Sequence, residues 1–334
     1  MKNCKIPQGY KSALNLKQTQ VAIKDVKDTF ESKISDSLNL TRVSAPLFVQ
    51  TTTGLNDNLN GTERPVNFDL FSGEHFEIVH SLAKWKRFAL KKYGFAHGEG
   101  LYTDMLAIRR DEETGNIHSI FVDQWDWEKV IDKTERNEQT LKSTVEKIYN
   151  SLKQTQDFIF EKFGEVGQKL PQNISFISTL ELEKMYPNES RKMREYLAVK
   201  EHGAVFIMGV GGDLADGEPH DGRAPDYDDW TLNGDIMVYF ETLDIALELS
   251  SMGIRVDEKA LENQLKIRGC EDRKAFPFHK ALLNGELPYT IGGGIGQSRM
   301  CMFMLGKCHI GEVQTSFWSD EVIDYCASKG VELL

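Results

Sequence analysis

The sequence predicts an α+β fold in which a mixed or antiparallel sheet is flanked by helices. Short segments rich in β-branched and aromatic residues outnumber clean strand–helix–strand alternations, and two long amphipathic helices accompany them. No stretch rich in Pro, Gly or Ser divides the 334 residues, so we expect a single domain over 1–334. A chain of this length buries enough surface to form a core without a metal or a disulfide.

The N-terminal part predicts a helix followed by a strand. Apolar residues recur every three or four positions from Ile23 to Leu38, the period of one helix face, which predicts a helix over 16–38. Residues 40–49 alternate and are β-branched, and Pro46 confines this strand to a sheet edge, a strand end or a bulge. Because a long helix that leads into such a strand is often a dimerisation element, residues 16–50 are the expected dimer element.

The remaining elements follow from periodicity and turn residues. Apolar spacing between Leu141 and Ile159 predicts a second long helix, which Gly164 ends. A basic helix is predicted over 81–92 and another helical stretch after Asp257. Strands are predicted over 76–80, 101–110, 117–127, 174–178, 204–210, 235–240 and 248–256.

Composition excludes several classes of protein. The 40 basic and 51 acidic residues leave a formal net charge of -11, which argues against nucleic acid as the main partner. No apolar run approaches 18 residues, and the lysines of 1–15 precede no apolar stretch, so neither a membrane span nor a secretory signal is expected. The five cysteines form no C-x-x-C pair, which favours reduced thiols in the cytoplasm over disulfides or zinc.

The strongest local signal is a glycine-rich run, GGGIGQSR, over 292–299. Its glycines allow a tight turn and a close approach to a flat ligand or phosphate, and Arg299 opens the next predicted helix as a donor to phosphate oxygens. A Rossmann dinucleotide fingerprint would require glycine at Gln297, so that class is disfavoured. A tight packing corner is the alternative to a nucleotide site.

Two further patterns carry charge at strand positions. Arg109 ends a predicted strand, where it is suited to a phosphate or carboxylate, although a solvated charge cluster explains the same pattern. Asp235 and Glu248 lie on successive strands and suit a Mg²⁺ that also contacts phosphate, while Arg255 is suited to an anion. A cross-strand salt bridge is the alternative.

These patterns resemble the three signatures of class II aminoacyl-tRNA synthetases in the correct order: a helix leading into VSAPL, then IRRDE, then GGGIGQSR. The match is closer, over nearly the whole chain, to the ammonia-dependent asparagine synthetases (aspartate–ammonia ligases), which are homodimeric relatives of the synthetase catalytic core. The segments that carry this resemblance are DNLNG at 57–61, HSLAKWKR at 80–87, VDQWDW at 122–127, RAPDYDDW at 223–230 and ELSSMGIR at 248–255. One departure is the short spacing between Trp230 and Asn233, which puts in doubt how that side of the site is covered.

The resemblance implies a class II synthetase-like fold and a reaction. Enzymes of this family adenylate the side-chain carboxylate of aspartate with ATP and Mg²⁺, and ammonia then attacks the β-aspartyl-adenylate to give asparagine, AMP and pyrophosphate. It also implies a cytoplasmic homodimer that acts on small molecules. On the ATP side it places Arg109 at the α-phosphate and Arg299 near the γ-phosphate and adenine. Glu112, Gly294 and Gly296 are expected at ATP, and Asp235 and Glu248 at Mg²⁺.

On the aspartate side, the resemblance implies a set of binding residues: Ser81, Lys86, Asp228, Ser251 and Arg255. Arg255 and Lys86 match positions that hold the side-chain carboxylate in aspartyl-tRNA synthetases. The substrate must here be turned end for end, so we expect Arg255 at the α-carboxylate, with Lys86 either nearby or facing the reacting carboxylate. Asp57 and Gln124 are the expected ammonium site, with Asp228 as a further acceptor, and Asp57 is the first choice as base. An Asx turn at Asp57 and a strand-edge hydrogen bond at Gln124 are the structural alternatives.

The sequence disfavours three other functions. A glutamine-dependent synthetase needs a processed N-terminal cysteine, and position 2 is Lys2. A tRNA-charging enzyme needs an anticodon-binding module, for which about 40 residues before the first signature leave no room. A catalytically silent paralogue should have lost phosphate arginines or magnesium carboxylates, and all four are present: Arg109, Arg299, Asp235 and Glu248.

Overall fold

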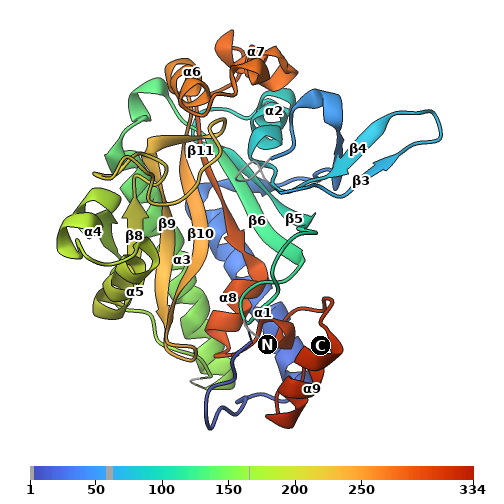
Figure 1. Ribbon diagram of the computed structural model, residues 1–334, viewed down its shortest axis with the longest axis vertical. Helices are drawn as coiled ribbons and strands as arrows, with labels where there is room; N and C mark the ends of the chain where they lie inside the picture. The colour runs from blue at the N-terminus through green and yellow to red at the C-terminus, as the bar shows by residue number, and fades with distance from the viewer. Residues whose placement is uncertain (1–3, 58–62, 165) are drawn as a thin grey trace.

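The computed structural model describes residues 4–57, 63–164 and 166–334, and their centre is an eight-stranded sheet (Figure 1). The strands between β5 and β8 pair antiparallel, whereas β1 with β5 and β7 with β8 are parallel pairs at the two edges. The sheet is therefore mixed, antiparallel in its centre. In spatial order its strands are β1 (Leu40–Arg42), β5 (Gly100–Ile108), β6 (Phe121–Val130), β11 (Thr290–Gly296), β10 (Ile245–Arg255), β9 (Asp228–Phe240), β8 (Ala204–Met208) and β7 (Ser175–Ser178).

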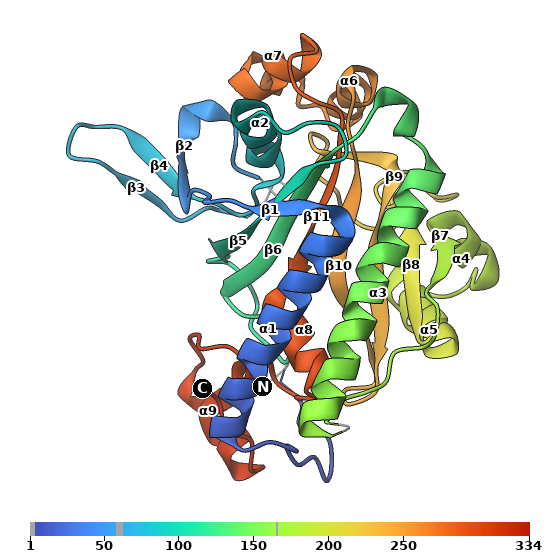
Figure 2. The same cartoon turned by 180° about the vertical axis from the view of Figure 1, so that it is seen from behind.

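Two long helices, α1 (Leu16–Leu38) and α3 (Glu138–Phe163), lie side by side behind this sheet (Figure 2). The predicted helix over 16–38 is confirmed, because Asn15 caps its start with Gln18 and Asn39 ends it in the left-handed region. Its buried side chains, from Ala22 to Leu38, recur at four-residue steps and form one apolar face. Phe30 packs on Trp125 with ring centroids 4.9 Å apart.

The other helices surround the ends and edges of the sheet (Figure 1). None of the helices within the described ranges is long and apolar enough to cross a membrane. These helices are α2 (Ala83–Tyr93), α4 (Thr179–Met185), α5 (Arg191–His202), α6 (Glu258–Ile267), α7 (Pro277–Leu283), α8 (Gln297–Met304) and α9 (Asp320–Ser328).

The segment 40–49 differs from the prediction of one strand. It forms two short strands in different sheets: β1 joins the main sheet, and β2 (Phe48–Gln50) joins β4 (His75–Ile78) and β3 (Asn67–Asp69) in a small three-stranded sheet that projects from the body (Figure 2). Pro46 lies between them, where its missing N–H cannot continue a ladder.

Two other predicted boundaries are wrong. The predicted strand 117–127 begins only at Phe121, because Asn116 accepts a bond from Ile310 N at its carbonyl and holds 116–120 in a loop. The predicted strand 235–240 begins earlier, at Asp228, and pairs with β10 as far as Arg255.

Candidate active site

A cavity of about 490 Å³ lies over the middle of the main sheet. Side chains alternate between the two faces of a strand, so Trp125, Trp127, Met252 and Ile254 enter the core with α1, while the intervening residues face the opposite side. Those intervening residues include Gln124, Asp126, Ser251 and Arg255, all of which line the cavity. One face of the sheet is thus the core and the other is the floor of a polar site.

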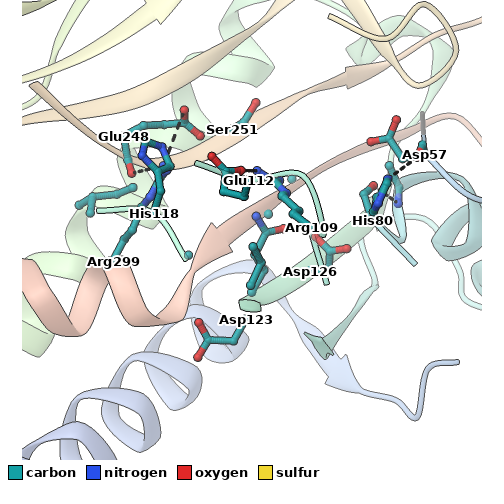
Figure 3. Close-up of a pocket in the computed structure, with 18 of the residues that line it drawn as sticks. Asp57, His80, Arg109, Glu112, His118, Asp123, Asp126, Glu248, Ser251 and Arg299 are labelled. Atoms are coloured by element: carbon teal, nitrogen blue, oxygen red, sulfur yellow. Dashed lines mark hydrogen bonds and ion pairs between the residues drawn. The ribbon is translucent and has the colours of Figure 1, made fainter. Parts of the chain in front are cut away.

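Every predicted site residue except Asp235 lines this cavity. Figure 3 shows several of them: Asp57, Arg109, Glu112, Glu248, Ser251 and Arg299. They come from the β5–β6 loop, from β6, β10 and β11, from the start of α8, and from 57, 81, 86 and 228. Asp235 lies next to it, since its carboxylate pairs with Arg223, which does line the cavity. The tertiary structure therefore brings together residues separated by up to 242 positions in sequence, Asp57 and Arg299 being the outermost.

The glycine-rich run is a strand rather than the predicted tight turn. Gly292, Gly293 and Gly294 lie in β11 between β6 and β10, with backbone dihedrals open to any residue. A Cβ on Gly294 would lie 2.5 Å from Gln124 Oε1 and 2.9 Å from Asp126 Oδ1. Gly292 and Gly294 are thus required by the side chains of Glu128, Gln124 and Asp126 on the neighbouring strand, whereas Gly293 is required by Met252 and the Ser251 carbonyl.

The β5–β6 loop and α8 place two arginines on one side of the cavity. Arg109 lies 3.9 Å from Glu112 through its terminal nitrogen, and its buried Nε has no hydrogen-bond partner in the described part of the chain. Arg299 donates from Nε to the Ile117 carbonyl at 3.3 Å, and its NH1 lies 3.3 Å from the Glu248 carbonyl. A buried guanidinium edge without a partner is a ready donor to an anion.

His118 lies between these arginines in Figure 3 and was missed by sequence reasoning. Burial, followed by the charges of Arg299 and Arg109, lowers the pKa of His118 to about 4, while Glu248 opposes that shift. The imidazole is therefore neutral at neutral pH. Nothing in the sequence marks His118, because its neighbours are brought there from α8 and β10.

Two carboxylates, Asp235 and Glu248, mark the next part of the site. Burial raises the pKa of Asp235 to about 6, Arg223 opposes the shift and Glu248 adds to it. Asp235 Oδ2 pairs with Arg223, while its buried Oδ1 has no hydrogen-bond partner among residues 4–57, 63–164 and 166–334. An unsatisfied buried carboxylate oxygen beside a second carboxylate fits a divalent cation, so the predicted Mg²⁺ residues suit that ion. Arg223 was not among the predicted residues.

Arg255 is fully buried between two carboxylates at the other end of the cavity. It donates to both oxygens of Glu128, from Nε at 3.0 and 3.1 Å and from NH2 at 2.8 Å, and it also pairs with Asp228. Burial alone would lower the pKa of Arg255, but Glu128 and Asp228 raise it. Two of its five N–H groups stay available for a ligand.

Lys86 lies close to the ion pair of Arg255 and Glu128. Its ammonium donates to the carbonyls of Trp127 at 2.9 Å and Gly293 at 3.1 Å, and lies 3.6 Å from both Asp126 and Glu128. Burial lowers its pKa, against the attraction of the two carboxylates. Most of its hydrogen-bonding capacity is used by the protein, which limits it to a single bond to substrate. Glu128 was missed, although a charge that alternates with Trp125 and Trp127 in β6 was a signal for it.

The predicted ammonium residues Asp57 and Gln124 line the same cavity as Asp228. Asp57 is buried, its carbonyl lies 3.1 Å from His80 Nδ1, and its carboxylate charge raises the pKa of Tyr227, for which burial is the larger cause. Residues 58–61 of that motif lie outside the described residues. Gln124 reaches over Gly294 into the cavity. Ser81 also lines the cavity, and its hydroxyl accepts from the N–H of Ala83 at the start of α2.

Comparisons with known proteins agree over almost the full length. A family model described as aspartate-ammonia ligase matches residues 17–330. A Clostridium perfringens protein named aspartate–ammonia ligase is 61% identical over 331 residues, 98% of each chain. A Fusobacterium nucleatum protein of that name is 60% identical over 325 residues, covering 97% of this chain and 99% of that protein.

Solved structures share the fold. An asparaginyl-tRNA synthetase from Entamoeba histolytica in complex with asparaginyl-adenylate superposes with a TM-score of 0.67 at 13% identity, over 91% of this chain and 68% of that one. The asparaginyl-tRNA synthetase from Pyrococcus horikoshii complexed with asparaginyl-adenylate gives 0.64 at 15%, over 89% and 68%. The class II synthetase-like fold is therefore confirmed, and by its sequence over nearly every residue this chain belongs to the aspartate–ammonia ligase family.

Proposed function

We propose that this chain converts L-aspartate, ammonia and ATP into L-asparagine, AMP and pyrophosphate through a β-aspartyl-adenylate. The observation that carries the proposal is one polar cavity lined by Arg109, Arg299, Glu248 and the buried Arg255, with Asp235 next to it, in a chain of the aspartate–ammonia ligase family. The part with Arg109 and Arg299 suits ATP, and the part with Arg255 suits the amino acid.

Activation of aspartate is an attack of its side-chain carboxylate on the α-phosphorus, with pyrophosphate as the leaving group. Such a step depends on positioning and on positive charge around the phosphate oxygens. Arg109 serves the α-phosphate, and Arg299 serves the γ-phosphate and adenine, with Glu112, Gly294 and Gly296 completing the nucleotide site. Asp235 and Glu248 would hold Mg²⁺, which when bound supplies further positive charge to phosphate oxygens.

The buried cluster at the other end orients aspartate. The two free N–H groups of Arg255 serve the α-carboxylate, and Asp228 accepts from the α-ammonium group. Ser81, Ser251 and the remaining proton of Lys86 line the path to the reacting carboxylate. This orientation leaves the side-chain carboxylate toward Arg109, which is the direction the reaction requires.

The nucleophile is ammonia, so an ammonium ion that enters the site must first lose a proton. Asp57 and Gln124 supply a carboxylate and an amide oxygen on the wall of the same cavity, and Asp57 takes the proton. The nitrogen then forms the amide bond and AMP leaves.

The decisive experiment is asparagine formation from aspartate, ATP, MgCl₂ and ammonium chloride, with glutamine replacing ammonium in parallel and AMP resolved from ADP. We expect asparagine and AMP from ammonium alone. ADP as the product would indicate an acyl phosphate and overturn the adenylate assignment. AMP and pyrophosphate without asparagine would indicate that the adenylate is passed to an acceptor other than ammonia.

We further propose a cytoplasmic homodimer of one domain, 1–334, joined through the 16–50 element. The edge strand β1 and the exposed side chains of Leu47 and Phe48 support this, because unpaired strand edges and exposed apolar groups are contact surfaces.

A further inference from the structure

The two ends of the chain meet at a small thiol cluster outside the cavity. The N and C labels of Figure 1 lie together beside α9. There the buried Cys308 and Cys326 pack with Val331 and with the partly buried Cys4, Ile6 and Tyr10. None of these residues lines the cavity, so the proposed reaction leaves the cluster without a role.

Within this cluster, the sulfurs of Cys4 and Cys326 lie 3.9 Å apart. A disulfide has an S–S length of about 2.05 Å, so the two sulfurs must come about 1.9 Å closer together. Cys326 is fully buried on α9, whereas Cys4 is partly exposed and belongs to a chain segment rather than a helix or strand. The partner that must move is therefore the one whose backbone is less constrained.

We propose that Cys4 and Cys326 are a disulfide-forming pair that joins the two ends of the chain when a peroxide is present. The sulfur of Cys4 attacks one peroxide oxygen, the O–O bond breaks, and a sulfenic acid and one water form. The sulfur of Cys326 then displaces the sulfenic oxygen as a second water. Two thiols lose two protons and two electrons in all, and hydrogen peroxide is reduced to two molecules of water.

A metal site at the same thiols is the competing interpretation, since a ring nitrogen of His309 lies within 4.8 Å of both sulfurs. The hydrogen bonding of the ring disfavours a metal. Burial lowers the pKa of His309 to about 4, so the imidazole is neutral, and its Nδ1 accepts from Gly311 N at 3.1 Å, which places the single proton on Nε2. A metal at Nε2 would require that proton to leave or to move to Nδ1, where it would break the bond from Gly311.

The bond would fix a segment that braces the active-site loop. Beside Cys4, Lys5 donates from its N–H to Asn116 Oδ1 at 2.7 Å and accepts from Asn116 Nδ2 at 2.9 Å. Ile117, the residue after Asn116, accepts at its carbonyl the hydrogen bond from Nε of Arg299. A link between positions 322 residues apart also restricts the unfolded chain far more than a local one would. We therefore expect the linked enzyme to resist heat without a change in its chemistry.

The test treats the untagged full-length enzyme with hydrogen peroxide, then measures intact mass, linked tryptic peptides, melting temperature and activity. We expect the loss of two hydrogens, one peptide joining Cys4 to Cys326, a melting temperature higher by at least about 3 °C, and unchanged kcat. Dithiothreitol should reverse all of these changes. Burial raises the pKa of both thiols, so the incubation should last hours rather than seconds.

Three variants make the result specific. Cys4→Ser should abolish the link, Cys308→Ser should retain it, and Cys270→Ser serves as the matched control because Cys270 is the other partly exposed thiol and precedes α7 at the far end of the molecule. A Cys4–Cys308 peptide, a sulfinic acid on Cys4 without a link, or zinc retained in equal molar amount would overturn the pair. A linked chain with an unchanged melting temperature would overturn the bracing role.

Discussion

Arg109 is suited to the phosphate role proposed for it because its guanidinium has few partners inside the described part of the protein. Its buried Nε has no partner within the described ranges, and Glu112 is its nearest carboxylate at 3.9 Å. We expect Arg109→Ala to lower aspartate-dependent ATP–pyrophosphate exchange by about 10²- to 10³-fold, because one preorganised donor to the transition state is removed. Arg110→Ala is the matched control, since Arg110 is exposed and outside the cavity. Wild-type exchange in Arg109→Ala would refute the assignment.

Gln124 allows the two chemical steps to be separated. We expect Gln124→Ala to leave pyrophosphate exchange within about twofold and to raise the KM for ammonium at least about tenfold, since its amide oxygen serves only the second step. Steady-state asparagine formation against ammonium concentration measures this. Gln139→Ala, an exposed position on α3, is the control. Unchanged ammonium saturation would withdraw the role of Gln124.

Asp235 predicts a pH dependence for cation binding. Because burial raises its pKa to about 6, the ionised fraction rises from about one-tenth at pH 5 to about nine-tenths at pH 7. Only the ionised form binds a cation, so affinity increases with pH. We expect Mn²⁺, titrated calorimetrically without nucleotide, to bind about tenfold more tightly at pH 7 than at pH 5.

In Asp235→Asn the affinity for Mn²⁺ should fall and its pH dependence should flatten. Asp244→Asn is the matched control, because Asp244 is remote from the cavity and asparagine tolerates its positive φ of 53°. Equal pH dependence in wild type and Asp235→Asn would show that another group controls the binding.

At the scale of elements, β11 is the strand whose sequence the site constrains most. Gly294→Ala would place a Cβ 2.5 Å from Gln124 Oε1 and 2.9 Å from Asp126 Oδ1. We expect a loss of at least about tenfold in kcat/KM for ammonium, as in Gln124→Ala, because Gln124 must leave its position. Gly212→Ala should keep wild-type activity, since its Cβ would meet no atom within 4 Å. Full activity in Gly294→Ala would mean that Gln124 and Asp126 can shift to accommodate the added Cβ.

The same elements show how far local sequence information reaches. The helix over 16–38 was predicted to the residue from its apolar period, and the structure adds a cap at Asn15 that fixes the same start. The glycine run was read as a turn, since glycine in isolation indicates conformational freedom. Its actual reason is a set of side chains on β6 and β10, which only strand pairing brings above it.

At the scale of the molecule, the proposed dimer makes a mass prediction. Sedimentation at micromolar concentration should give twice the 38.0 kDa of one chain. Leu47→Glu should shift the equilibrium toward monomer, because it replaces an exposed apolar side chain next to β2 with a charged one. Leu180→Glu, on the exposed side of α4, is the control and should stay dimeric. If the wild-type protein sediments as a monomer under these conditions, the assignment of residues 16–50 as a dimer element is refuted.

The sequence by itself determined the fold class, the family and a set of site residues of which all but Asp235 line the cavity, because long motifs such as RAPDYDDW fix both identity and position. The tertiary structure decided what those residues face. Arg255 holds Glu128 and Asp228 before any substrate arrives, and Asp235 pairs with Arg223. His118, Arg223 and Glu128 emerged only there, since burial and cross-strand neighbours set the charge and hydrogen bonds of a side chain, and neither is encoded at one position of the chain.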